Sequence, residues 1–303
     1  MLRPSKEERL KYKVDYAQDT EFSAFARLLQ SKWRERKGYP ATQYGNFIDA
    51  DFAKVSKVNF LTANIQELVT KEIHNARISG GLIGQPRIWH NLLSSQPLCF
   101  NLFGELHYDL ELATIYFQRL FPDKIDKVTA VRFEYSPGRG DSKYIGDHSA
   151  FDVFVEYTKG KHRGFIGIEV KYAESLREET KLKAEKNYKE RYATVTEESG
   201  IFINNSVPFL RQPPLSQIWR DHLLSIATKQ DYDEGFFVFL FPSGNTHCQA
   251  GVDNYRKYLA NDLEEENGFC PRYLEDFINA LADISIRLYT RIKITILGRW
   301  QLI

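Results

Sequence analysis

The sequence predicts an α/β protein in which a mixed four-stranded sheet is flanked by helices and preceded by a helical region. The first observation is a set of short segments that either alternate apolar and polar residues or run continuously apolar, as strands do. These segments are residues 128–135, 151–157, 164–172 and 235–241. The second observation is that the chain before residue 95 shows helical rather than strand periodicity.

Two segments of this front region are predicted to be helical. Residues 5–37 are rich in helix formers and stop at Gly38, and residues 49–78 repeat apolar positions at helical spacing. A cluster of glycines then interrupts the pattern. We therefore expect a mostly helical accessory region over residues 1–94 and a second domain over residues 95–303.

The second domain is expected to open with one amphipathic helix and then to alternate strands and helices. A turn-rich stretch separates the first two strands, and a short connection compatible with a hairpin joins the second to the third. The predicted elements, in chain order, are a helix at 99–121, strands at 128–135, 151–157 and 164–172, a charged segment at 174–198, a helix at 214–228, a strand at 235–241, a helix at 271–288 and a final strand at 292–297.

Composition limits the class of protein. With 303 residues, of which 43% are hydrophobic, the chain can bury a sizeable core. Its 41 Lys and Arg residues nearly balance 40 Asp and Glu residues, which gives a formal charge of +1. The net charge therefore does not by itself indicate a nucleic-acid partner. A local basic patch is still compatible with this net charge.

The cysteines and the N-terminus bear on location. Cys99, Cys248 and Cys270 are far apart and form no CxxC pair, which argues against a disulfide scaffold and a thiolate zinc site. The first residues are charged, and no apolar run is long enough to cross a bilayer. We expect a cytoplasmic protein that is not associated with a membrane.

The predicted strand at 164–172 carries two opposite charges in otherwise apolar surroundings. Side chains alternate faces along a strand, so Glu169 and Lys171 project from the same side, roughly 6–7 Å apart. Two further Glu-x-Lys pairs, at 35–37 and 179–181, lie in charged segments that read as helices, where such pairs are ordinary solvated decoration. Only the middle pair has a strand context.

Asp152 lies in the preceding predicted strand. If the two strands pair, Asp152 and Glu169 approach each other at one edge of the sheet, and their like charges call for a cation between them. Mg²⁺ prefers carboxylate and carbonyl oxygens, so the backbone carbonyl of Val170 is a further candidate ligand. Lys171 beside the same cavity suits a phosphate or an attacking water. The alternative interpretation is an exposed cross-strand ion pair that contributes little.

Asp152 followed by Glu169-Val170-Lys171 resembles the motif of the PD-(D/E)xK nuclease superfamily, the restriction-endonuclease-like fold, over about residues 95–241. The resemblance implies an αβββαβ core and Mg²⁺-dependent cleavage of DNA, with Mn²⁺ able to substitute. A frequent glutamate of the first core helix would fall on Glu105, as a catalytic or metal-binding residue, and a polar residue of the second core helix on Gln217. The sequence departs from the motif at Phe151, where the superfamily often has proline.

Three functional hypotheses follow. The favoured one is an endonuclease that hydrolyses DNA, with Asp152, Glu169 and Glu105 toward the metal and Lys171 toward the attacking water. A homodimer is an expectation, because cutting both strands often uses two active sites. The second hypothesis is an inactive scaffold that binds nucleic acid or protein, and the third is a nuclease that acts on RNA or branched structures.

Overall fold

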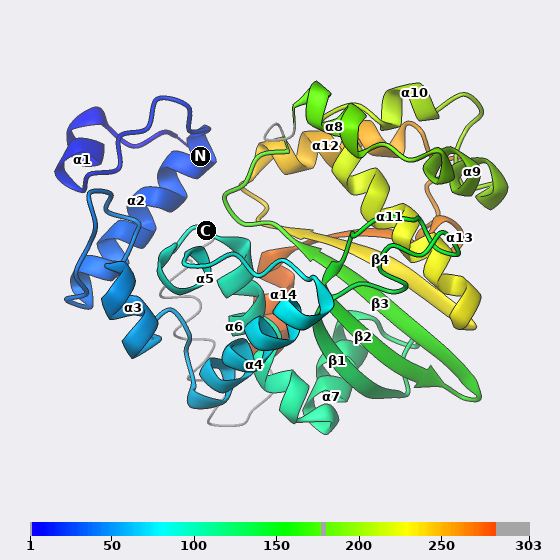
Figure 1. The fold of residues 1–303 in the computed structure, drawn as a ribbon, viewed down its shortest axis with the longest axis horizontal. Helices are drawn as coiled ribbons and strands as arrows, with labels where there is room; N and C mark the ends of the chain where they lie inside the picture. Colours follow the sequence, from blue (N-terminus) through cyan, green and yellow to red (C-terminus); the bar gives the residue numbers. More distant parts are fainter. Residues whose placement is uncertain (1, 177–179, 283–303) are drawn as a thin grey trace.

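The computed structural model describes residues 2–176 and 180–282, and its centre is one mixed five-stranded sheet with the strand order β1-β2-β3-β4-β5 (Figure 1). Strand β2 runs antiparallel to both β1 and β3, whereas β4 runs parallel to both β3 and β5. The strands are β1 (Lys127–Tyr135), β2 (Phe151–Lys159), β3 (His162–Val170), β4 (Glu234–Phe241) and β5 (Phe269–Tyr273). The α/β class and the four predicted strands are confirmed. The sheet has a fifth strand, β5, where the sequence predicted the beginning of a helix.

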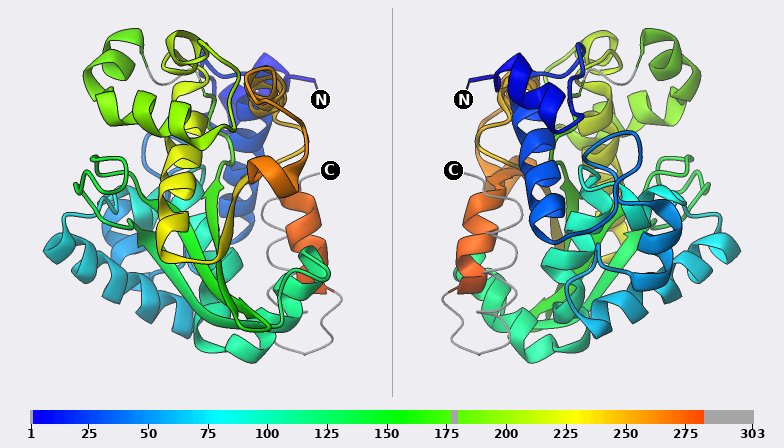
Figure 2. Two further views of the ribbon diagram at one scale, coloured as in Figure 1. Left: turned by 90° about the vertical axis from the view of Figure 1, so that its right-hand side faces the viewer. Right: turned by 90° about the vertical axis from the view of Figure 1, so that its left-hand side faces the viewer.

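Helices cover both faces of the sheet. On one face, α6 (Ser95–Tyr108) and α7 (Leu110–Leu120) pack with α14 (Leu274–Ala282) in one apolar cluster. On the other face, α11 (Ser216–Thr228) packs over β4. Figure 2 shows α11 (yellow) and α14 (orange) on opposite sides of the strands. Side chains of β3 alternate between the two clusters, as a strand buried on both faces requires.

The remaining helices lie at the periphery. Helices α8 to α10 (green) and the front helices α1 to α3 (blue) occupy different sides of the molecule in Figure 1. The front helices are α1 (Lys6–Lys11), α2 (Glu21–Arg36), α3 (Ala50–Ser56), α4 (Ala63–Ser79) and α5 (Arg87–His90). The later ones are α8 (Lys181–Asn187), α9 (Glu190–Ser199), α10 (Val207–Leu210), η1 (Lys229–Asp231), α12 (Thr246–Arg256) and α13 (Glu264–Asn267).

Several predicted helices are divided by side-chain caps. The helix expected over 99–121 breaks at Asp109, whose carboxylate accepts a hydrogen bond from the N–H of Leu112 at 2.9 Å and begins α7. In the front region, Thr20 caps α2 and Thr62 caps α4 in the same way. Such caps satisfy the N–H groups at a helix start, so each begins a new helix within a continuous helical pattern.

The front helices and the sheet share a core. The apolar cluster that holds α6, α7 and α14 also includes Phe22 and Trp33 of α2 and Leu68 of α4. The division into residues 1–94 and 95–303 remains a prediction. The final strand expected at 292–297 and the end of the helix expected at 271–288 lie outside the described residues. Within the described ranges, no helix is both long enough and apolar enough to cross a membrane.

Candidate active site

Strand register brings three carboxylates into a row across β1, β2 and β3. Val153 pairs with Ile168 on β3 and with Phe133 on β1. One residue further along each strand, toward the carboxyl end of β3, stand Glu134, Asp152 and Glu169. The approach of Asp152 to Glu169 that the sequence suggested therefore follows from antiparallel pairing of β2 and β3.

Asp152 is held at this edge by a backbone contact. Its Oδ2 accepts a hydrogen bond from the N–H of Val170 at 2.8 Å, which fixes the carboxylate against the end of β3. Burial raises the pKa of Asp152 well above its usual range, and the charges of Glu169 and Glu134 raise it further, against a lowering effect of Lys171. This carboxyl therefore lies in a pocket of excess negative charge.

Glu169 and Lys171 form a buried ion pair. Lys171 Nζ donates to Glu169 Oε1 at 2.6 Å, and each residue is only 8% exposed. Burial alone would lower the pKa of Lys171, but the carboxylates of Glu169, Asp152 and Glu174 outweigh burial, and its pKa is raised. The surrounding carboxylates therefore favour the ammonium form of Lys171. The exposed ion pair of the alternative interpretation is not what the structure shows.

Gln217 of α11, also predicted from the sequence, contacts Glu169. Its Nε2 donates to Glu169 Oε1 at 2.9 Å, so Glu169 Oε1 accepts from both an ammonium and an amide. Two donors on one oxygen fix the orientation of the Glu169 carboxylate. The structure thus brings together Asp152, Glu169, Lys171 and Gln217 from β2, β3 and α11.

Glu134 of β1 lies next to these residues, although the sequence analysis did not single it out. Burial and the charge of Glu169 raise its pKa to about 7, against a lowering hydrogen bond from Gln96 of α6. Its backbone has a φ of 48°, in the left-handed region that glutamate rarely adopts. Strained residues of this kind gather at functional sites. Its register position opposite Asp152 was the available signal, but the pairing of β1 with β2 is needed to read it.

Asp221 is a second residue that the sequence did not single out. It lies one turn after Gln217 on α11 and is 6% exposed, and its Oδ2 is buried without a hydrogen-bond partner among the described residues. Burial raises its pKa well above the usual range, and the charge of Glu169 adds to that shift. The spacing of four residues from Gln217, which places both on one helix face, was the only sequence signal.

Glu105 does not join this group. Its carboxylate accepts hydrogen bonds from Thr62 Oγ1 and from Asn64 Nδ2, the latter at 3.0 Å, and both donors lie at the start of α4. A carboxylate at a helix N-terminus complements the helix dipole. Glu105 was expected to be a catalytic or metal-binding residue, whereas in the structure its carboxylate connects α6 to α4.

The chemistry of the donor set fits a hard divalent cation. The charge of Glu169 helps to raise the pKa of both Glu134 and Asp152, and among the described residues Lys171 is the ammonium that lies beside these acids. A divalent cation would relieve this surplus and is bound by such oxygens. As the chain stands, no group of three His, Cys, Asp or Glu residues in the described part is already arranged around a metal position. The carbonyl of Val170 stays a predicted ligand.

An α/β fold with these acids and one lysine at the carboxyl end of a central strand defines a phosphodiesterase-like site. Comparison with protein families gives the same result: a model of the PD-(D/E)XK nuclease superfamily matches residues 17–292. The chain belongs to the PD-(D/E)XK nuclease superfamily, which confirms the resemblance seen in the sequence. The match extends into the front helices. No curated protein and no solved structure gives a significant match.

Proposed function

We propose that this protein is a Mg²⁺-dependent endonuclease that hydrolyses phosphodiester bonds of DNA, with Mn²⁺ as a substitute. The observation that supports the proposal most strongly is the buried pair of Glu169 and Lys171 at the end of β3, with the partly buried Asp152 beside it. A buried ion pair contributes little net stability, because desolvation offsets its attraction. A buried Glu169–Lys171 pair with two partly buried acids, Asp152 and Glu134, beside it is therefore better explained by chemistry than by folding.

Asp152 and Glu169 would hold the cation, with Glu134 as an additional acid in place of Glu105. A divalent cation bound there would lower the pKa of a water molecule and neutralise charge on the phosphate. The hydrogen bond from Val170 orients Asp152, and that from Gln217 orients Glu169. Both acids are thus pre-positioned, so little reorganisation is needed when substrate arrives.

Lys171 supplies a fixed positive charge. Since its pKa is raised, it stays protonated at neutral pH and donates hydrogen bonds rather than accepting a proton. We assign it to orienting the attacking water and to stabilising negative charge that develops on the phosphoryl oxygens. A homodimer would place two such sites on the two strands of a duplex.

The test is incubation of the purified protein with plasmid and linear DNA, with Mg²⁺, with Mn²⁺ and with a chelator. We expect cleavage of closed circular plasmid only with metal, and loss of cleavage in Asp152→Ala and Lys171→Ala. Equal activity in these variants would contradict the site. Absence of cleavage under every condition, in a folded protein that binds DNA, would favour the inactive scaffold. Parallel incubations with RNA and with branched DNA show which class of substrate is cut.

A further inference from the structure

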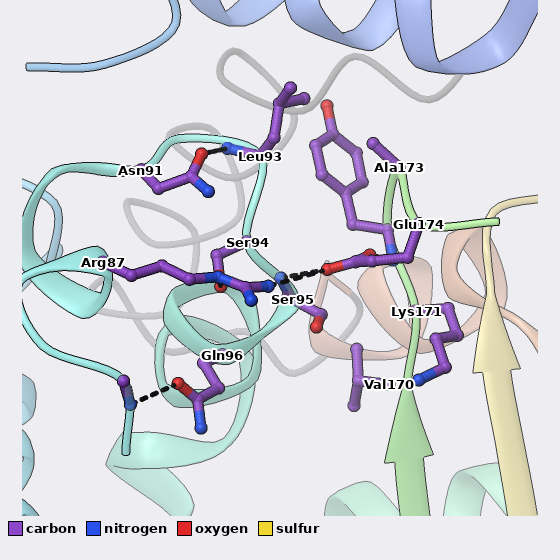
Figure 3. A network of polar contacts seen from close by, with 12 residues as sticks. Arg87, Asn91, Leu93, Ser94, Ser95, Gln96, Val170, Lys171, Ala173 and Glu174 are labelled. Carbon is purple, nitrogen blue, oxygen red and sulfur yellow. Dashed lines mark hydrogen bonds and ion pairs between the residues drawn. The ribbon is translucent and has the colours of Figure 1, made fainter. Parts of the chain in front are cut away.

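A cavity of about 550 Å³ opens beside the candidate site, between the front helices and the segment that follows β3. Ala173 and Glu174, two and three residues after Lys171, form one wall. Figure 3 shows the side chain of Glu174 in this segment directed toward Arg87 of α5. A cavity of this volume is in the range of small-ligand sites and accommodates a single nucleotide.

The opposite wall includes α2, which is hydrogen-bonded to the residues that follow β3. Ser23 of α2 donates its hydroxyl to the carbonyl of Ala173 at 2.7 Å, and Gln30 Nε2 donates to Tyr172 Oη at 3.1 Å. These contacts join α2 to the residues directly after Lys171.

The charges of the lining are already balanced. Arg27 makes two hydrogen bonds with Asp19, at 2.7 and 2.8 Å. Arg87 lies 3.6 Å from Glu174, a long contact, and its side chain is 55% exposed. The interior therefore favours a neutral, polar group, while Arg87 at the mouth can turn toward a phosphate without breaking a close ion pair.

One lining residue presents an unused donor. Asn46 is fully buried, and its Oδ1 accepts from Arg27 Nη1 at 3.1 Å. Since a guanidinium only donates, this contact assigns the oxygen, and the Nδ2 amide has no hydrogen-bond partner in the described part of the chain. A buried donor of this kind calls for an acceptor, and the carbonyl and ring nitrogens of a nucleobase supply one.

Two half-buried aromatic rings line the same cavity. The guanidinium of Arg27 lies 3.9 Å from the centre of the Tyr16 ring. The ring centres of Phe47 and His90 are 5.1 Å apart. Flat aromatic and guanidinium surfaces are the groups on which proteins stack unpaired bases.

We propose that this cavity takes one unpaired nucleotide of the substrate strand, next to the bond that is cut. The base would stack beside Tyr16 and accept from Asn46, and Arg87 would contact a flanking phosphate. The inference rests on the proposed nuclease function and narrows it: the substrate class is DNA that exposes an unpaired nucleotide near the cut, as at a gap, flap or single-stranded segment.

The experiment measures binding without catalysis. Fluorescence anisotropy in the presence of a chelator compares a labelled single-stranded oligonucleotide, a duplex of the same sequence and the mononucleotide dAMP as competitor. We expect the single strand to bind more tightly than the duplex and dAMP to compete only weakly. Tyr16→Ala should weaken single-strand binding about tenfold. Arg87→Ala should weaken it about fivefold and lower its dependence on salt.

Matched controls remove the same side chains elsewhere. Tyr108→Ala takes away a half-exposed ring at the end of α6, among Glu67, Glu72 and Glu105, and Arg77→Ala takes away an exposed arginine of α4. Both controls should bind like the wild type. If Tyr16→Ala melts early, Arg87→Ala decides, because an exposed side chain is removed without loss of core.

Wild-type binding in both Tyr16→Ala and Arg87→Ala would overturn the inference, as would a duplex bound as tightly as the single strand. If dAMP competed with an affinity equal to that of the oligonucleotide, the cavity would be a site for free nucleotides. That result would also overturn the inference. Because the measurement needs no metal, it is separable from the nuclease test. Loss of binding in the variants with no cleavage in the wild type would refute the nuclease alone, and cleavage with unchanged binding would refute the cavity alone.

Discussion

Asp221 and His222 are neighbours on α11, and both are buried, yet their surroundings differ in kind. His222 Nε2 donates to the carbonyl of Asn267 at 2.8 Å, and Nδ1 accepts from the hydroxyl of Tyr255 at 2.9 Å. Asp221 instead faces Glu169 and keeps one oxygen without a partner in the described structure. Helix α11 therefore carries one buried residue with all its hydrogen bonds made, His222, and next to it a buried acid, Asp221, with one oxygen unpaired in the described part of the chain.

This difference separates structural from functional burial. A buried polar group with all its partners stabilises the fold, whereas an unpaired one costs free energy and persists where function requires it. His222 belongs to the first kind, and Asp221, whose Oδ2 has no partner among the described residues, belongs to the second. The predictions below test whether the two neighbourhoods differ in this way.

The largest expected effect is on catalysis, at the acidic side. Glu169→Gln removes the negative charge that holds Lys171 and would bind the cation, so metal-dependent cleavage of plasmid should fall at least about a hundredfold. The matched control is Glu35→Gln, which changes the exposed Glu-x-Lys pair at the end of α2. Wild-type rates in Glu169→Gln would show that the buried pair is structural.

Substitution of His222 should change the free energy of unfolding. His222→Leu leaves the hydroxyl of Tyr255 and the carbonyl of Asn267 buried without their partner, and should lower the free energy of unfolding by about 3 kcal/mol. Urea denaturation measures the change. His162→Leu, at an exposed position at the start of β3, should change it by less than about 0.5 kcal/mol. A similarly small effect at His222 would remove the distinction between the two neighbourhoods.

Protonation of His222 gives a pH dependence with a definite sign. Burial lowers its pKa from 6.5 to about 3 in the folded protein, so between these values the unfolded chain binds a proton that the folded chain does not. The stability that neutral His222 provides is complete above about pH 6.5 and is lost as the pH falls. By pH 5 the loss should be about 2 kcal/mol.

His222→Leu should abolish that part of the slope, as measured by urea denaturation between pH 7 and pH 4.5. An unchanged slope in the variant would show that other groups account for the acid sensitivity.

The smallest expected effect is a gain. Asp221→Asn keeps the size of the side chain and removes a buried acid beside Glu169, so the free energy of unfolding at pH 7 should rise by about 1 kcal/mol. Thermal and urea denaturation check the change. A loss of stability of similar size would mean that Asp221 is a satisfied structural residue like His222.

Local pattern predicted the strands well, because alternation and apolar runs are properties of neighbouring residues. The positions of β1 to β4 and the pairing of Asp152 with Glu169 follow from such patterns and from the connection between β2 and β3. Strand β5 was missed because its five residues contain Pro271 and Arg272, which weaken a strand signal.

The parts of the site that the sequence did not predict depend on contacts between distant segments. Glu134 looked like an ordinary strand residue until its pairing with β2 and its contact with Gln96 were known. Glu105 has a plausible position on its helix, but the direction of its side chain is decided by Thr62 and Asn64, some forty residues earlier. The cavity beside the site joins α2 and α5 to the end of β3, a juxtaposition that no local pattern encodes.

The most direct test of the central claim is titration of the protein with Mn²⁺ by calorimetry, in the wild type and in Asp152→Asn. We expect saturable binding to the wild type that is lost in the variant, with a rise in the wild-type melting temperature when metal is bound. Identical isotherms for the two proteins, or no binding to a folded wild type that still cuts DNA, would contradict the claim that these acids grip a cation.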